Sequence, residues 1–226
     1  MSKVKVCIVI ICSAFLFSHV NAHAQFGGFL KNVAKKKAEE ELLGAVDLDV
    51  LKEQQGGLIG RYHASLSNKL AGQKHLALSM GMPEEAAEAD TQLNILRQDT
   101  SYTKEALKKA WETSKDLSKT LEKKLRRTKK MDDEQRAELA LATPFYAQST
   151  ANALKLGPEF ATWLKGATWA VKSGGVRGGL AVAGSLDHGV FVGKRMPDYL
   201  KESKKSYKNI RKAAKKHEVD IEEIDV

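Results

Sequence analysis

The densest group of charged side chains that could bind a ligand lies between residues 201 and 216, where basic residues recur at spacings of three and four. That spacing places them on one face of a helix, expected to begin near Pro197, with an apolar stripe opposite. A basic amphipathic helix binds anionic surfaces or acidic partners by charge, although a merely solvated face is an equally good interpretation. The predicted contact residues are Lys204, Lys205, Lys208, Arg211, Lys212, Lys215 and Lys216.

A second basic cluster spans residues 123–130 and contains Arg126 and Arg127. It could contact the same kind of anionic partner. It could equally stabilise the carboxyl end of its own helix, where cations interact favourably with the helix dipole. We include both arginines in the predicted binding site.

Motifs for catalysis are missing from the sequence. No two histidines beyond residue 24 have the i, i+4 spacing that places a metal between them on a helix. There is no Gly-x-Ser-x-Gly elbow and no complete phosphate-binding loop. We therefore expect a non-enzymatic protein that uses no metal or cofactor. A hydrolase whose active site converges only in three dimensions is the third and weakest alternative.

Residues 159–193 are the second candidate site. Seven glycines lie from Ser173 to Gly193, and small residues let helices approach closely. One hypothesis is a membrane-inserting hairpin, as in helical pore formers, with tryptophans at the interface. Its membrane-facing residues would be Trp163, Trp169, Gly178, Gly179, Gly184 and Phe191. A close-packed helix, a buried turn or a flexible loop is favoured instead, because no segment reaches the roughly 20 apolar residues of a membrane span.

Helical periodicity predicts the elements that position these sites. Apolar residues recur at threes and fours over residues 48–80 and again over about 84–130, with a break and a new helix start between them. The second stretch has a heptad seam whose polar positions include Thr100 and Thr103, which favours packing within the chain. The predicted fold class is all-α, an elongated helical bundle with a long antiparallel, coiled-coil-like hairpin between these stretches.

Capping and proline signals predict the later helix boundaries. Asp132 can cap a new helix while Gln135 reaches back to it. Pro144 should kink or split this helix, and the pair at 157–158 should end it and open the next.

Residues 1–24 have the order of an export signal. Lys3 and Lys5 precede an apolar run of about a dozen residues, which ends before the small-residue triplet at 22–24. The run is too short for the roughly 20 residues of a spanning helix, so we expect removal after Ala24 or after Ala22. The remainder is predicted as a single helical domain, 25–217, and an acidic tail, 218–226, that is disordered or folds back on the lysines.

Charge and cysteine content indicate the compartment and the partner. The formal net charge is +9, and it becomes +7 without residues 1–24, which hold two lysines and both cysteines. A cysteine-free exported chain fits the bacterial envelope, either periplasmic or secreted. Excess positive charge there favours an envelope protein, an anionic lipid or an acidic polysaccharide as partner over nucleic acid. The sequence does not determine the oligomeric state.

Overall fold

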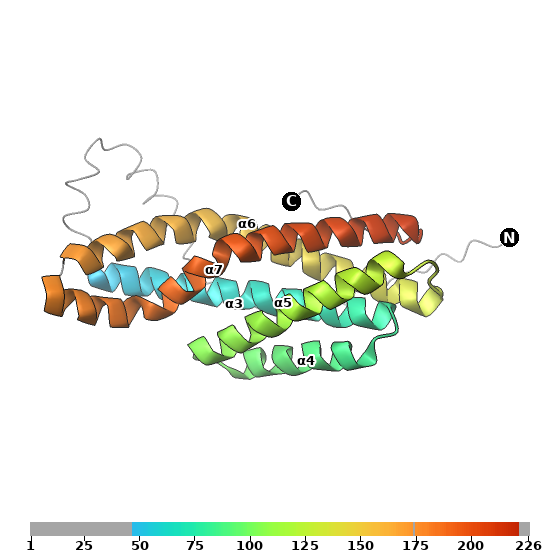
Figure 1. Cartoon of the computed structure of the whole chain (residues 1–226), viewed down its shortest axis with the longest axis horizontal. Helices are drawn as coiled ribbons and strands as arrows, with labels where there is room; N and C mark the ends of the chain where they lie inside the picture. The colour runs from blue at the N-terminus through green and yellow to red at the C-terminus, as the bar shows by residue number, and fades with distance from the viewer. Residues whose placement is uncertain (1–46, 174, 222–226) are drawn as a thin grey trace. The chain divides into compact units, whose positions relative to one another are not determined.

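The computed structural model describes residues 47–173 and 175–221, and within them it contains five helices and no strand (Figure 1). The all-α prediction is therefore confirmed. The described ranges leave out residues 1–24, which hold the predicted export signal. They also leave out residues 25–46, 174 and 222–226. The helices are α3 (Leu48–Ser79), α4 (Pro83–Gln98), α5 (Lys104–Arg127), α6 (Asp133–Ser173) and α7 (Gly175–Lys216).

Helix α3 lies at the centre of this bundle. It packs along α6, and α4 and α5 cover another side of it, while α7 packs mainly on α6 (Figure 1). Helices α6 and α7 run antiparallel and contain 41 and 42 residues. The long helical hairpin is thus formed by α6 and α7. Of the predicted pair, α3 packs on α4 and α5, which divide the segment 84–130 between them.

The prediction of one helix over 84–130 is wrong because the chain turns at residues 99–103. The carboxylate of Asp99 accepts hydrogen bonds from the Thr103 amide at 2.6 Å and from its hydroxyl at 2.9 Å. Thr103 in turn caps α5 by accepting from the Ala106 amide at 3.3 Å. Short polar side chains compete in this way for backbone donors. Thr100 and Thr103 therefore belong to a turn and a cap, and not to a helical seam.

The predicted starts of α4 and α6 are confirmed. Gly81 has φ +65°, a left-handed conformation that glycine adopts freely, and α4 begins at Pro83. Before α6, the Asp132 carboxylate accepts from the Gln135 amide at 2.8 Å. The Asp132 amide donates to the Gln135 side chain at 3.1 Å, which completes the reciprocal capping box.

Three prolines lie inside helices, so the predicted split at Pro144, the break at 157–158 and the start near Pro197 are wrong. Each proline is exposed, and each is followed two residues later by a fully buried aromatic side chain. An interior proline costs about 3 kcal/mol. The burial of the next turn offsets this cost, which is why the helices continue. The three buried aromatic residues are Tyr146, Phe160 and Tyr199.

The described part of residues 159–193 is a closely packed pair of helices rather than a loop. Trp163 is only 3% exposed, and its indole nitrogen donates to the Leu51 carbonyl at 3.0 Å. A Cβ atom at Gly189 would lie 2.5 Å from the Trp163 ring, and one at Gly193 would lie 3.0 Å from the Leu164 side chain. The two helices approach so closely at Gly189 that a larger residue would force a shift, while at Gly193 the Leu164 side chain would have to yield slightly.

Gly72 offers a test of such close approach. A Cβ atom there would lie 2.6 Å from Tyr146 on α6, whereas one at Gly56 would meet nothing within 4 Å. We expect Gly72→Ala to lower the free energy of unfolding by about 1–3 kcal/mol through overpacking. Gly56→Ala should raise it by roughly 0.5–1 kcal/mol, because alanine favours a helix interior. Urea unfolding followed by circular dichroism measures both, and equal changes would contradict the packing of α3 on α6.

Candidate anion-binding groove

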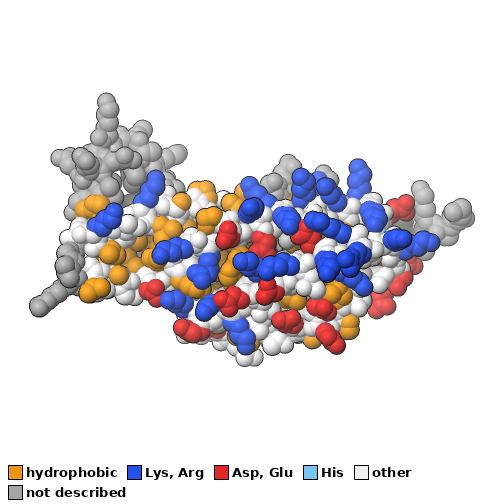
Figure 2. Space-filling view, viewed as in Figure 1, with side chains coloured by type: hydrophobic (Ala, Val, Ile, Leu, Met, Phe, Trp, Pro, Cys, Tyr) orange, Lys and Arg blue, Asp and Glu red, His pale blue; other side chains and the backbone are white. Residues whose placement is uncertain are grey.

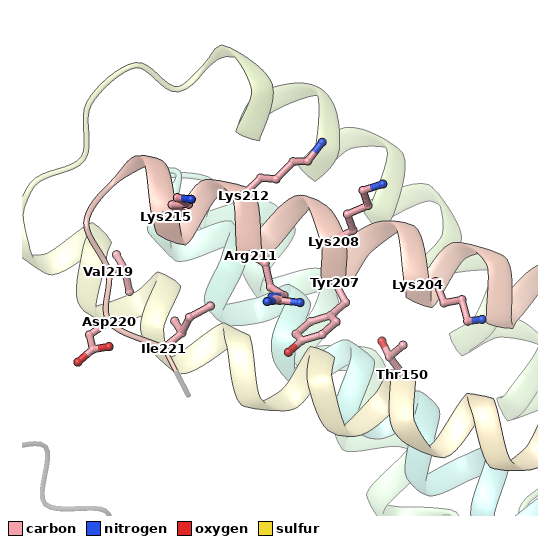
Figure 3. A pocket seen from close by; sticks show the side chains of 10 residues that line it. All are labelled: Thr150, Lys204, Tyr207, Lys208, Arg211, Lys212, Lys215, Val219, Asp220 and Ile221. Carbon is pink, nitrogen blue, oxygen red and sulfur yellow. The ribbon is translucent and has the colours of Figure 1, made fainter. Parts of the chain in front are cut away.

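A groove of about 790 Å³ lies between the carboxyl-terminal half of α7 and helix α6 (Figure 3). Its other wall is the segment that follows α7, including Val219, Asp220 and Ile221. Five of its lining residues are basic, and all five belong to the predicted binding helix. They are Lys204, Lys208, Arg211, Lys212 and Lys215.

Helical spacing places these cations in two rows. Residues 204, 208 and 212 follow one another at intervals of four, as do 211 and 215, so neighbours in a row are about 6 Å apart along the axis. Arg211 and Tyr207 point from α7 toward α6, where Thr150 also faces the groove, whereas Lys208 and Lys212 point away from α6 on the outer side of α7 (Figure 3). The guanidinium carbon of Arg211 lies 5.8 Å from the centroid of the Tyr207 ring. The groove therefore has a mixed aromatic and cationic floor and a cationic rim.

The apolar wall of the groove forms because the chain reverses after α7. The Val219 amide donates to the Ala214 carbonyl at 2.9 Å, and Glu218 has φ 56°. This is the Schellman arrangement that ends many helices, although glycine usually holds the left-handed position. It turns the chain back beside α7, and Val219 packs against the core while Ile221 joins the lining of the groove.

A buried ion pair anchors α7 one turn before the groove. Lys69 of α3 has no exposed side-chain surface, and its ammonium lies 3.3 Å from the Glu202 carboxylate. The ammonium also faces the rings of Trp111 and Tyr199 at 5.4 and 5.3 Å. Burial lowers the pKa of Lys69, while Glu202 acts in the opposite direction. A charge held this deeply constrains how α7 packs on α3, because any other rotation would leave it unpaired.

Buried hydroxyl groups strengthen the same anchor. The Tyr199 hydroxyl lies 2.9 Å from the hydroxyls of both Ser65 and Ser149, which joins α7 to α3 and α6. The Thr150 hydroxyl lies 3.2 Å from the Ser203 carbonyl, to which it can donate. Burial raises the pKa of Tyr199 to about 12, so the phenol stays protonated and able to donate even at alkaline pH. Together with the Lys69 pair, these bonds hold α7 with its lysine rows outward.

The structure separates the predicted basic residues into two sets. Lys204, Lys208, Lys212 and Lys215 line the groove, and none of them forms an ion pair within residues 47–173 and 175–221. Lys205 pairs with Glu122 of α5 at 2.8 Å. The ammonium of Lys216 donates to the Thr128 carbonyl at 2.7 Å. Both of these cations thus have contacts outside the groove.

The arginines of the first basic cluster do not line the groove. Arg126 pairs with Glu122 on its own helix, and Arg127 is exposed at the last residue of α5. Figure 2 shows Lys and Arg side chains gathered over α5 and the carboxyl-terminal half of α7, with hydrophobic side chains more frequent toward the junction of α6 and α7. Electrostatic attraction can therefore extend beyond the groove, although all five of its basic lining residues lie on α7.

The residues predicted to face a membrane are spread over different environments. Trp163 and Gly179 are buried, Trp169 and Phe191 are half-buried, and Gly178 and Gly184 are exposed. Within the described ranges, no helix combines the length and the apolar character that crossing a membrane requires.

Sequence reasoning missed the buried charge. Lys69 belongs to a helical stripe with steps of three and four residues, all of whose side chains are buried. The stripe consists of Tyr62, Leu66, Lys69 and Gln73. A lysine at the helical spacing of core residues could have indicated this buried charge from the sequence.

The groove lining contains neither a catalytic group beside a partner base nor a metal site. Among the described residues, no three or more His, Cys, Asp or Glu side chains come together in a way that could hold a metal ion. The ammonium, guanidinium and hydroxyl donors of the groove can bind anions. No family model, curated protein sequence or solved structure matches the chain.

Proposed function

We propose that the protein is a non-catalytic binding protein of the cell envelope, and that it holds an anionic lipid surface, acidic polysaccharide or acidic partner protein in the groove between α6 and α7. One observation carries this proposal. Four lysines line the groove without an ion pair in the described part of the chain, while neighbouring Lys205 and Lys216 are engaged elsewhere. The envelope location rests on the export pattern of residues 1–24.

The groove suits a ligand that presents several negative groups in a row. Lysines about 6 Å apart along the axis can contact successive charges of such a ligand. Arg211 adds a planar donor, which favours phosphate or carboxylate groups. Binding should weaken as salt rises, because exposed charges are screened within about 10 Å at 0.1 M ionic strength.

The test is a variant that removes the four groove lysines by Lys204→Gln, Lys208→Gln, Lys212→Gln and Lys215→Gln. Each basic side chain near an anionic membrane contributes about 1 kcal/mol. We therefore expect affinity for mixed phosphatidylcholine and phosphatidylglycerol vesicles to fall on the order of a hundredfold or more. Vesicle sedimentation at several salt concentrations measures the loss.

A matched variant controls for total charge. It replaces four exposed lysines outside the groove that form no ion pair within the described residues, and its net charge equals that of the test variant. These are Lys108, Lys109, Lys165 and Lys172, each changed to Gln. If both variants lose affinity equally, binding depends on overall charge and the groove has no special role.

Membrane insertion is the alternative function, and exposed Leu180 in the glycine-rich region is the observation that favours it. Leu180 is 72% exposed, the highest value among the large apolar residues described. The burial of Trp163 against Gly189 opposes it, because insertion would have to open that contact. Dye release from the same vesicles separates the two functions. Groove binding should give salt-sensitive adsorption without release, whereas release that survives high salt and is lost in Gly178→Asp/Gly184→Asp would support insertion.

A further inference from the structure

The segment that follows the groove wall is strongly acidic. In residues 218–225, five side chains are Asp or Glu and three are Val or Ile. The groove presents the opposite charge beside a partly apolar wall. The chain therefore carries, next to the groove, a segment whose chemistry matches that of the ligand proposed above.

The path of the described chain leads this segment to the groove. The Schellman turn at Glu218 sends the backbone back beside α7, and Val219, Asp220 and Ile221 already line the groove (Figure 3). Asp220 thus brings one carboxylate of the segment to the groove lining. Ile221, which directly precedes the rest of the segment, is thus itself a lining residue.

The next residues are also long enough to pass most of the lysines. Four residues, 222–225, can extend over at most about 13–14 Å. The lysine rows, from residue 215 back to 204, rise over about 16 Å of helix. Glu222, Glu223 and Asp225 could therefore each reach a different part of the rows.

We propose that residues 222–225 bind the groove of their own chain, so that an anionic partner must displace them. Opposite charge, an apolar wall and the direction of the chain favour this intramolecular ligand over a second copy. The displacement step rests on the proposed function. The intrachain contact does not, and it can be tested without any external ligand.

Zero-length carbodiimide cross-linking of the purified protein tests the contact directly. It joins an amine to a carboxylate only when the two touch, and peptide mass spectrometry identifies the pair. We expect cross-links from Lys208, Lys212 or Lys215 to Glu222, Glu223 or Asp225, with a yield that is independent of protein concentration and falls with salt. Absence of these cross-links, or a yield that rises with protein concentration, would overturn the inference.

Neutralising the segment tests the displacement. The variant Glu222→Gln/Glu223→Gln/Asp225→Asn should bind the phosphatidylglycerol vesicles roughly five- to tenfold more tightly, because the groove no longer has an internal competitor. A control, Glu84→Gln/Glu88→Gln/Glu112→Gln, changes net charge by the same amount at exposed sites on α4 and α5. Equal gains in the two variants would show that only net charge matters and would refute displacement.

The combined results separate this inference from the proposed function. If the cross-links form but neither the lysine variant nor the acidic-segment variant alters vesicle binding, the intrachain contact stands and the proposed function fails. If the cross-links are missing while the lysine variant still weakens binding, the proposed function stands and this inference fails.

Discussion

Replacing Glu202 with alanine is expected to lower the free energy of unfolding by about 3 kcal/mol, because it leaves a buried ammonium without its ionic partner. Lys69 is fully buried, and Glu202 is its ionic partner at 3.3 Å. Within the described residues the ammonium has no well-aligned hydrogen-bond acceptor. Chemical denaturation followed by circular dichroism measures the loss.

The dependence of this loss on pH identifies its cause. Burial lowers the pKa of Lys69 below its usual value near 10.5, so between the two values the unfolded chain binds more protons than the folded chain. The contribution of this group to stability therefore rises with pH through that window. Without Glu202 the folded-state pKa should fall further, and the deficit of the variant should shrink at alkaline pH. A deficit that is constant with pH would point to lost packing instead.

Two controls accompany this variant. The double change Lys69→Met/Glu202→Leu should restore stability to near that of the natural protein, because apolar side chains of similar size replace both charges. Breaking an exposed pair should have no measurable effect, and Asp116→Asn on α5 removes such a partner from Lys119. If Glu202→Ala unfolds like the natural protein, the ammonium is not held in the core as described.

Trp163→Ala is expected to have the second large effect, a loss of about 3–5 kcal/mol of unfolding free energy. The side chain is buried, its nitrogen donates to the Leu51 carbonyl at 3.0 Å, and its ring fills the space beside Gly189. Removal would leave a cavity at the junction of α3, α6 and α7 and would break the hydrogen bond between α6 and α3. The denaturation assay used for Glu202→Ala measures this loss.

Trp169→Ala is the matched control for Trp163→Ala. Trp169 is half-buried on the same helix, so its removal should cost less than half as much. If both tryptophans faced lipid, the two variants would leave stability in water unchanged and would weaken vesicle binding alike. A clear difference in stability with equal vesicle binding is the result expected for a packed helical pair.

These two variants also connect the core to the groove. The Lys69–Glu202 pair and the Tyr199 hydroxyl hold α7 against α3 and α6, and the lysine rows follow directly on the same helix. A helix that rotated to release the buried charge would carry the lysines out of the groove. Glu202→Ala should therefore weaken anion binding as well, although Glu202 is not a lining residue.

Local sequence signals were enough to predict the features that depend on neighbouring residues. The all-α class follows from apolar spacing, the α4 start from Gly81 and Pro83, and the α6 start from the reciprocal bonds of Asp132 and Gln135. The convergence of Lys204, Lys208 and Lys212 on one face also follows from helical period alone. Such signals act within one turn of the chain, so they can be read without knowing the fold.

Features that depend on burial became visible in the folded chain. The tertiary structure shows that α6 and α7 continue through their prolines because the next turns are buried, and that Asp99 ends a helix that periodicity alone would continue. It also separates the four groove lysines from Lys205 and Lys216, and it pairs Lys69 with a residue 133 positions away in the chain. The physical reason is that desolvation and charge pairing depend on which distant side chains share a space, and no local pattern specifies that partner.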